Sequence, residues 1–438
     1  MRIFKLNGVH VPHRKNTAAM PAVKMPAPAE VAIPMSMHIG APAIPTVKPG
    51  DKVCVGDIIG QANGFISSPI HASISGTVKK IEPMLTSSGS YVDSVVIESD
   101  GTMSVSESVC PPTVTSTEEF LTAVRDSGIV GLGGAGFPTT AKLSVKDLSK
   151  IEAVIVNGAE CEPYITSDTR TMLDDAEWIK KGVSLLEKYL KVKKVIIGIE
   201  NNKPECVAKM HEVFSGDSAV EVMALPAMYP QGGEKVLIYN TTGKVVPEGG
   251  LPIDVGTIVI NCTTVASIAK YIETGMPLVS KCVTVDGSAV KEPKNVIAPI
   301  GTRLADLFAF CGGFKAEPKK VLYGGPMMGI AVPGTDVPIL KNTNAVIALD
   351  EHDAKPKEHT PCINCGKCVD CCPLRLNPVA MAKAFARKDV GELEALKVNL
   401  CMECGCCAFI CPTGQPLVER HRLSKALVKA NKQKEAKK

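Results

Sequence analysis

Ten of the 17 cysteines in this 438-residue chain lie in one short segment, where they form an internal repeat. Two stretches superimpose at a constant offset of 39 residues, and both read C-x2-C-x2-C-x3-C-P. The first stretch begins at Cys362 and the second at Cys401. Disulfides rarely cluster in this way in a large chain that begins without a secretion signal, so the repeat predicts a metal-binding segment.

The repeat has the ligand pattern of bacterial two-cluster ferredoxins, in which three closely spaced thiolates hold one [4Fe–4S] cube and the Cys before Pro ligates the other cube. This pattern predicts one cluster held by Cys362, Cys365, Cys368 and Cys411 and a second held by Cys401, Cys404, Cys407 and Cys372. Cys371 competes with Cys372 for the last place, but the offset puts Cys371 on Ile410 and Cys372 on Cys411. We therefore expect Cys371 and Cys406 to be packing thiols. Structural zinc is the alternative, although zinc favours paired C-x2-C hooks with a longer spacer.

The composition is that of a globular chain, with 45% apolar and 21% charged residues. Aromatic residues make up only 4%, which disfavours stacking platforms for nucleic acid. No apolar run reaches the ~18 residues of a membrane-spanning helix, so we expect a soluble or peripheral chain with no transmembrane segment of its own.

The segment 420–438 holds eight Lys and Arg against one Glu. We expect this basic tail to be a frayed, solvated end, with an electrostatic anchor as the alternative.

Composition and turn signals divide the chain into five segments. Residues 1–110 have short alternating apolar runs broken by Gly and Pro, which predict a small β domain similar to lipoyl-carrying barrels. Helical patterns alternate with buried-strand patterns over 111–275, which predicts an α/β domain. Strands dominate again over 276–350, with one helix at Leu304–Phe310. The cysteine-rich segment occupies 351–419 and begins with a polar linker at His352–Thr360, and the basic tail follows it.

A glycine-rich string runs from Gly131 to Gly136 and contains G-x-G-x-x-G. A dinucleotide fingerprint follows a strand and opens a helix, but here the preceding segment is the helical pattern Thr117–Asp126. Glycines permit close approach of the backbone, so that N–H groups can bind a phosphate. A tight turn without a ligand is the alternative on these residues alone.

Four segments in order resemble the FMN-binding, NADH-oxidising flavoprotein subunit of respiratory complex I. They are GLGGAGFPTTAK from Gly131, NGAECEP from Asn157, YPQGGE from Tyr229 and NCTT from Asn261. The whole chain also resembles the C-subunit family of Rnf electron-transport complexes, with HIGAP at His38 and SPIHA at Ser68 in its first domain. This second resemblance implies a multidomain α/β fold: a lipoyl-like barrel sandwich, a complex I flavoprotein-like domain, a β-grasp module and a helical domain that is ferredoxin-like and holds two [4Fe–4S] clusters.

The resemblance also implies roles for individual residues. Gly131, Gly133 and Gly134 would let the loop contact FMN, and Lys142 would balance flavin charge. Hydrogen bonds to flavin atoms would come from Asn157, Glu160, Asn261 and Thr264. Contacts to the nicotinamide nucleotide would come from Phe137, Glu162 and Glu234. Ala159 stands where the complex I loop has Asp, so one flavin contact of that relative is missing.

The implied function is electron transfer from NADH through FMN to the two clusters. The complex would move electrons between NADH and ferredoxin and would couple this transfer to Na⁺ or H⁺ translocation. Its implied place is peripheral, on the cytoplasmic side of the cell membrane, with other subunits of the complex, including an iron–sulfur subunit, as partners. A flavin and iron–sulfur cobalamin reductase of bacterial microcompartments and a non-catalytic electron relay are the alternatives. No protein nucleophile or general base is required, because the redox cofactors carry the chemistry.

Overall fold

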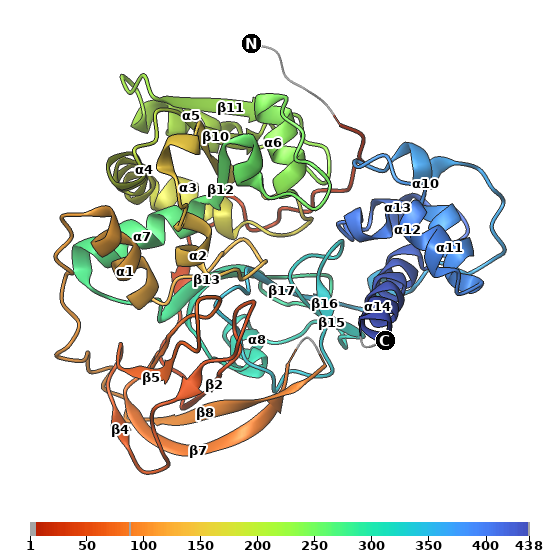
Figure 1. The fold of residues 1–438 in the computed structure, drawn as a ribbon. Helices are drawn as coiled ribbons and strands as arrows, with labels where there is room; N and C mark the ends of the chain where they lie inside the picture. The colour runs from red at the N-terminus through yellow and green to blue at the C-terminus, as the bar shows by residue number, and fades with distance from the viewer. Residues whose placement is uncertain (1–5, 87–88, 437–438) are drawn as a thin grey trace.

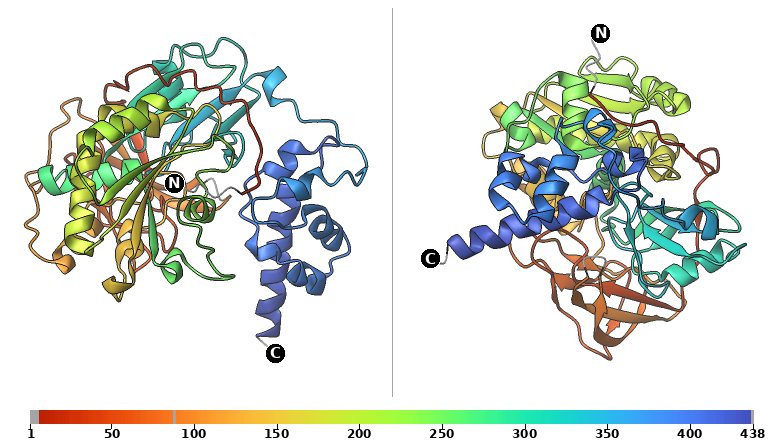
Figure 2. Two further views of the ribbon diagram at one scale, coloured as in Figure 1. Left: turned by 90° about the horizontal axis from the view of Figure 1, so that it is seen from above. Right: turned by 90° about the vertical axis from the view of Figure 1, so that its right-hand side faces the viewer.

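The computed structural model describes residues 6–86 and 89–436, and it divides them into four units (Figure 1). A barrel-sandwich unit is followed by an α/β domain, a module built on a mixed sheet, and a helical unit at the C-terminal end. The helical unit, in blue, lies at one side of the molecule, well away from the barrel-sandwich unit in red and orange (Figures 1 and 2).

The barrel-sandwich unit contains two small antiparallel sheets, as the alternation of the first segment predicted. The four-stranded sheet has the order β2 (Glu30–Pro34), β8 (Tyr91–Ser99), β7 (Gly76–Leu85) and β4 (Lys52–Val53). The three-stranded sheet has the order β3 (Ile44–Pro45), β5 (Ile58–Gln61) and β6 (Ile70–His71). Their facing apolar residues, Ile33, Ile59 and Ile97 among them, are fully buried.

Residues 6–25, which the sequence placed in the first domain, form no strand of these two sheets and pair with other units. Strand β1 (Val23–Lys24) pairs in parallel with β14 of the mixed-sheet module. Val9 forms a backbone bridge to Tyr229, and the half-buried Lys15 donates to three carbonyls in the α/β domain. These pairings join residues more than a hundred positions apart, so the local sequence carries no sign of them.

The α/β domain has a four-stranded parallel sheet in the order β11, β10, β9 and β12. Three of these strands were predicted, and their buried apolar residues confirm the parallel arrangement: β9 (Ala153–Gly158), β10 (Val195–Glu200) and β12 (Thr257–Asn261). Strand β11 (Val220–Leu225) was missed because it is an edge strand, half exposed and interrupted by Glu221.

Helices cover both faces of this sheet. Helix α1 (Thr117–Asp126) matches its prediction. Its N-cap is Ser116, which forms a capping box with Glu119. The other helices of the domain are α2 (Thr139–Leu143), α3 (Ser167–Asp174), α4 (Ala176–Leu190), α5 (Pro204–Val213), α6 (Glu234–Thr242) and α7 (Cys262–Thr274). Helices α4 and α7 pack side by side.

The mixed-sheet module has six strands in the order β1, β14, β13, β17, β15 and β16. Beyond β1, its strands are β13 (Ser280–Asp286), β14 (Lys294–Pro299), β15 (Lys320–Tyr323), β16 (Ile330–Ala331) and β17 (Ala345–Leu349). Helix α8 (Leu304–Phe310) has the predicted bounds and buries Leu304, Leu307 and Phe308 against the sheet.

The helical unit contains no strand within residues 351–436. Its helices are α9 (Glu351–Ala354), α10 (Lys367–Asp370), α11 (Pro378–Ala386), α12 (Val390–Ala395), α13 (Cys406–Ile410) and α14 (Leu417–Glu435). Helices α11 and α12 lie between the two cysteine stretches. The expected frayed tail is wrong within residues 420–435, because these form α14, which packs on α11 and α12.

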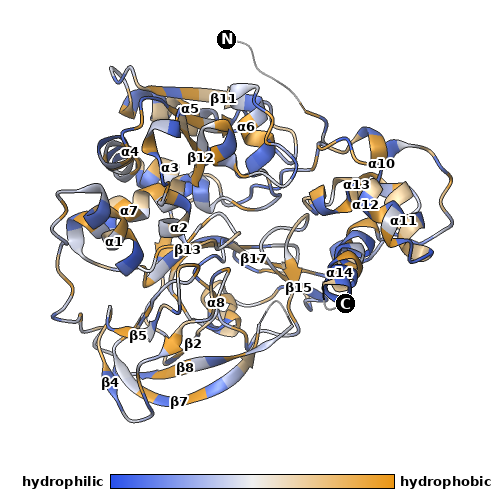
Figure 3. Ribbon diagram, in the orientation of Figure 1, coloured by the Kyte–Doolittle hydropathy of each residue, from blue (hydrophilic) through white to orange (hydrophobic). Residues whose placement is uncertain are grey.

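Helix α14 has one buried face, although its sequence is dominated by Lys and Arg. Figure 3 shows polar and apolar residues along the same helix. His421, Ser424 and Val428 are buried on the inner face, whereas Leu423 is 56% exposed on the outer face. The basic residues therefore mark the solvent face of a helix that packs as far as Val428, and from Lys429 to Glu435 the helix is almost entirely exposed.

Val428→Asp tests this packing. The substitution buries an unpaired charge and is expected to destabilise the helical unit by about 3–5 kcal/mol. Leu423→Asp introduces the same charge on the exposed face of the same helix and is expected to change stability by less than about 0.5 kcal/mol. Thermal unfolding followed by circular dichroism under anaerobic conditions measures both. Equal midpoints for the two variants would contradict the packed helix.

In residues 6–86 and 89–436, no helix combines the length and apolar character required to cross a bilayer.

Candidate functional site

A cavity of about 1280 Å³ runs along the edge strand β12 and reaches the carboxyl ends of β12 and β9 at Asn261 and Asn157. Ligands of open α/β sheets bind at the carboxyl ends of the strands, and the volume exceeds the ~300–1,000 Å³ of a typical small-molecule site. Eight of the residues expected to contact a nucleotide line the cavity: Gly131, Gly133, Phe137, Lys142, Asn157, Glu234, Asn261 and Thr264. The fold therefore brings these predicted residues together around one cavity, although they span more than 130 positions of the chain.

The glycine string forms a closed loop. The amide of Gly131 donates to the carbonyl of Phe137 at 2.8 Å, and the amide of Gly136 donates to the carbonyl of Gly131 at 3.1 Å. Gly134 has φ +111° and Gly136 has φ +67°, which are conformations that favour glycine. Gly134 does not line the cavity, and its carbonyl accepts a hydrogen bond from Asn342 Nδ2 at 2.8 Å.

Asn157 follows the buried part of β9, and its side chain is held by two backbone contacts. Asn157 Nδ2 donates to the carbonyl of Gly232 at 2.9 Å, and Asn157 Oδ1 accepts from the amide of Ala159 at 3.1 Å. Both Asn157 and Gly232 line the cavity. The segment that carries Gly232 is thereby fixed against the end of the central strand.

The N-terminus of α7 forms a second wall. Asn261 is its N-cap, and Asn261 Oδ1 accepts from the amide of Thr264 at 3.2 Å. Thr264 Oγ1 accepts from the amide of Leu132, which fixes the glycine loop to the helix end. Asn261 Nδ2 donates to Asp168 at 2.7 Å. Sequence reasoning missed Asp168, because nothing in its local sequence distinguishes it from other acidic residues at helix starts.

An ion pair stands at the rim of the cavity. Lys142 Nζ lies 2.6 Å from Glu234 Oε1 and donates to the carbonyl of Val259 at 3.0 Å. Both side chains are about one third exposed, at 33% and 39%. The pair presents one positive and one negative group to a ligand in the cavity.

The structure does not bring Glu160 and Glu162 into the cavity lining. The Glu160 carboxylate accepts from the amides of Asp168 and Thr169, at the start of α3, and burial raises the pKa of Glu160 to about 7. The Glu162 carboxylate accepts from the amides of Met327 and Met328, so it ties the α/β domain to the mixed-sheet module. Their roles toward a nucleotide stay predictions, and their present partners are structural.

A half-buried lysine that the sequence did not single out supports the same loop. Lys15 Nζ donates to the carbonyls of Glu160, Glu162 and Ile165 at 2.8, 2.9 and 2.5 Å. Burial lowers the pKa of Lys15. Because Lys15 comes from the N-terminal segment, only the folded chain places it here.

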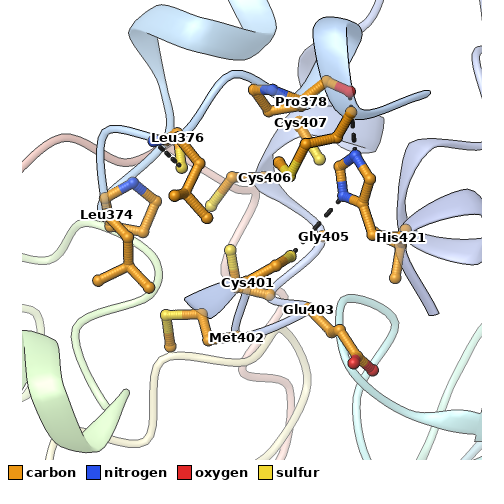
Figure 4. Close-up of a pocket in the computed structure, with 15 residues that line it drawn as sticks. Leu374, Leu376, Pro378, Cys401, Met402, Glu403, Gly405, Cys406, Cys407 and His421 are labelled. Carbon is orange, nitrogen blue, oxygen red and sulfur yellow. Dashed lines mark hydrogen bonds between the residues drawn. The ribbon is translucent and has the colours of Figure 1, made fainter. Parts of the chain in front are cut away.

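Two further pockets lie in the helical unit, and each is lined by four of the predicted cluster ligands. One is lined by Cys362, Cys365, Cys368 and Cys411. The other is lined by Cys372, Cys401, Cys404 and Cys407, together with Cys406 (Figure 4). Each pocket thus combines three cysteines of one stretch with the Cys before Pro of the other stretch, which is the crossed arrangement of the sequence prediction. The assignment of these thiols as ligands stays a prediction.

The lining of these pockets suits an iron–sulfur cube. Apart from its cysteines, the second pocket has mainly apolar residues such as Leu374, Leu376 and Met381. Within the part of the chain that the structure describes, no three His, Cys, Asp or Glu side chains are placed to share one metal ion. The thiolates of a cubane each bind a separate iron, so they stand around a volume and do not converge on a point.

Cys371 and Cys406 differ from these thiols in their contacts. Cys371 is buried, does not line either pocket, and donates to the carbonyl of Cys368. Cys406 donates to the carbonyl of Tyr229 at 3.8 Å, although its side chain also reaches the second pocket. His421 adds a polar group there: its Nδ1 lies 3.7 Å from Cys401 Sγ, and its Nε2 lies 3.0 Å from the carbonyl of Pro378 (Figure 4).

A short chain segment lies between the second cysteine pocket and the large cavity: Gly232 lines the cavity, and a Cβ added at Gly233 would be 2.5 Å from Cε of Met402, which lines the cysteine pocket. The amide of Gly232, which lines the cavity, donates to Cys161 Sγ at 3.3 Å, and Cys161 packs in one apolar cluster with Cys404, Cys406 and Cys407. Burial raises the pKa of Cys161, so it is held as a thiol. The first cysteine pocket lies at the surface, because Cys362 and Cys365 are exposed.

Comparisons with known proteins agree with this organisation. The models of three families match: the RnfC barrel sandwich hybrid domain over residues 4–102, the Nuo51 FMN-binding domain over 124–270, and the SLBB domain over 282–331.

Curated relatives match along most of the chain. The C subunit of the proton-translocating ferredoxin:NAD(+) oxidoreductase complex of Clostridium ljungdahlii is 42% identical, over 90% of this chain and 86% of its own length. The Na(+)-translocating counterpart of Acetobacterium woodii is 43% identical, over 89% and 88%. Among solved structures, the NAD+-reducing [NiFe]-hydrogenase in the H2-reduced state covers 72% of this chain and 63% of its own, with 19% identity and a TM-score of 0.49.

Proposed function

Because this chain belongs to the C-subunit family of ion-translocating ferredoxin:NAD(+) oxidoreductase complexes, we propose that it is the NADH-oxidising electron-transfer subunit of such a complex. Electrons pass from NADH through FMN to two [4Fe–4S] clusters and on to another iron–sulfur subunit. The observation that carries this proposal is the closeness of a nucleotide-sized cavity to a pocket lined by predicted ligand thiols: Gly232 lines the cavity, and the next residue, Gly233, lies against Met402 of the cysteine pocket.

The large cavity is the site for FMN and for NADH. Its residues fit a flavin nucleotide: amide groups of the glycine loop and the N-terminus of α7 suit a phosphate, and Asn157 and Asn261 offer side-chain amides. Lys142 and Glu234 suit the charged and ribose groups of the two nucleotides. A bound flavin accepts a hydride and passes on single electrons, and the protein orients the reactants and tunes their charge.

The two cysteine pockets are the sites of the clusters, and their positions set an order. The cluster held by Cys372, Cys401, Cys404 and Cys407 would lie next to the cavity, because Met402 of its pocket lies against Gly233, which follows the cavity residue Gly232. The cluster held by Cys362, Cys365, Cys368 and Cys411 has two exposed cysteines. The buried cluster therefore receives electrons from the flavin, and the exposed cluster passes them to a partner. The helical unit is in this respect ferredoxin-like.

The protein works as a peripheral subunit on the cytoplasmic side of the cell membrane, where its partners include an iron–sulfur subunit and, indirectly, ferredoxin. Family membership does not fix the translocated ion, since the names of the two relatives give a proton in one case and Na⁺ in the other.

Anaerobic titration with NADH tests this function. After reconstitution with FMN, the chain is expected to bind one flavin, and NADH should bleach its absorbance near 450 nm within the mixing time of a stopped-flow experiment, on the order of milliseconds. A non-catalytic relay would hold clusters but show no flavin bleaching. Failure to bind FMN under any reconstitution would contradict the proposal.

Glu234→Gln probes the cavity rim. Loss of the carboxylate removes a charged hydrogen-bond acceptor for NADH and is expected to raise the KM for NADH about tenfold or more, with FMN content unchanged. Glu212→Gln is the control, because Glu212 pairs with Lys209 on the surface and is 70% exposed. An unchanged KM in the Glu234 variant would contradict its contact with NADH.

A further inference from the structure

Residues of the glycine loop alternate between two sides. Gly131, Gly133, Ala135 and Phe137 line the large cavity, whereas Leu132, Gly134 and Gly136 do not. The loop therefore has an inner side toward the cavity and an outer side toward the rest of the protein.

The carbonyls of the three outer residues are all held by other units of the molecule. Lys281 Nζ of the mixed-sheet module donates to the carbonyl of Leu132 at 2.5 Å. Asn342 Nδ2 of the same module donates to the carbonyl of Gly134 at 2.8 Å. The amide of Ile39, in the barrel-sandwich unit, donates to the carbonyl of Gly136 at 2.9 Å. The two units that flank the α/β domain thus donate hydrogen bonds to alternate carbonyls of one loop.

Because of peptide geometry, these hydrogen bonds also set the direction of the amides on the inner side of the loop. In a trans peptide the C=O and the following N–H point in opposite directions within one plane. Fixing the carbonyls of Leu132 and Gly134 outward therefore turns the amides of Gly133 and Ala135 inward. Within residues 6–86 and 89–436, these two amides have no hydrogen-bond partner. Gly133 also lies beside the N-terminus of α7, since a Cβ added there would be 3.1 Å from Asn261 Nδ2.

Inward amides beside a helix N-terminus form a concave donor site for a phosphate. Lys281 is the group that fixes the first of them. Lys281 is 4% exposed, and within the described residues its ammonium donates one hydrogen bond, to the Leu132 carbonyl. A buried ammonium is costly unless it is well paired, so its presence behind this one carbonyl needs a reason.

We propose that Lys281 is a positioning residue for a phosphate group of the nucleotide in the cavity: it holds the Leu132 carbonyl outward so that the Gly133 amide donates inward to phosphate. This inference rests on the proposed function, because the phosphate belongs either to FMN or to the dinucleotide. The mixed-sheet module, which does not line the cavity, then contributes to nucleotide affinity through the backbone of its neighbour.

Lys281→Met tests the inference, because methionine keeps the unbranched stem of the side chain and removes the ammonium donor. Dissociation constants of FMN and of riboflavin, which lacks the phosphate, are measured by flavin fluorescence on flavin-depleted protein with intact clusters. The constant for NAD⁺ is measured on the FMN-loaded protein. We expect the substitution to weaken FMN about tenfold or more and leave riboflavin unchanged. Selective weakening of NAD⁺ would also support the inference and would assign the phosphate to the dinucleotide.

Lys341→Met is the matched control. Lys341 is also a buried lysine of the mixed-sheet module, but Lys341 Nζ donates to the carbonyls of Pro69 and Gly128, which precede the loop. Its loss loosens the contact between units without turning a loop amide, so the ratio of FMN to riboflavin affinity should stay at the wild-type value.

Three results would each overturn the inference while leaving the proposed function in place. The first is a Lys281 variant with wild-type affinity for both FMN and NAD⁺. The second is equal weakening of FMN and riboflavin, and the third is the same change of their affinity ratio in the Lys341 variant; both indicate a general loss of packing. A wild-type chain that binds neither nucleotide would instead overturn the proposed function itself.

Discussion

Replacement of Cys372 by alanine is expected to lower the iron content from about eight to about four atoms per chain, whereas Cys371→Ala should keep about eight. The two cysteines are neighbours in sequence, so the substitutions are closely matched. Cys372 lines the pocket of the second stretch, and Cys371 lines neither pocket. Iron and acid-labile sulfide analysis of anaerobically purified protein measures the difference.

Crossed ligation makes a sharper form of the same prediction. Cys372→Ala and Cys404→Ala should remove the same EPR signal, although Cys372 belongs to the first stretch of the repeat. Cys411→Ala and Cys365→Ala should remove the other signal. If Cys372→Ala abolishes the same signal as Cys365→Ala, each cluster takes its ligands from one stretch only, and the crossed assignment is wrong.

The second large effect concerns the order of the clusters. In Cys365→Ala, which lacks a ligand of the exposed cluster, NADH should still reduce the flavin and the buried cluster at wild-type rates. In Cys404→Ala, which lacks a ligand of the buried cluster, NADH should bleach the flavin, but reduction of the exposed cluster should slow by a factor of at least about 100. The basis is position, because Cys404 packs near the cavity wall and Cys365 is exposed.

Freeze-quench EPR after mixing with NADH separates these cases, and flavin absorbance provides the internal control for nucleotide binding. Cys406→Ala is the protein control, since it removes a neighbouring thiol that is outside both ligand sets. Fast reduction of the exposed cluster in Cys404→Ala would contradict the order, and would mean that electrons leave the flavin by another route.

Local sequence was sufficient where structure depends on neighbours in the chain. The β-branched runs of β9, β10 and β12 form buried parallel strands, and the apolar spacing at Leu304–Phe310 forms α8 with the predicted bounds. The cysteine repeat allowed a prediction over a longer range: the constant offset matches each cysteine of one stretch to its counterpart in the other, and so predicts which cysteines share a pocket.

Local sequence was insufficient where the outcome depends on another unit. Glu160 and Glu162 follow β9 in a segment typical of a flavin site, but their carboxylates are engaged by the amides of α3 and of the mixed-sheet module. The contacts of Lys15 and Lys281 connect residues about 150 positions apart. Basic residues also dominated the sequence of α14, although burial of Val428 determines its structure.

Metal analysis combined with EPR of the NADH-reduced protein is the decisive measurement for the two clusters. Anaerobically purified chain is expected to be brown, to contain about eight irons and eight sulfides, and to show two reduced cubane signals after addition of NADH and FMN. Colourless protein with zinc in place of iron would contradict the proposed electron path, because a chain without these clusters cannot carry electrons away from the flavin.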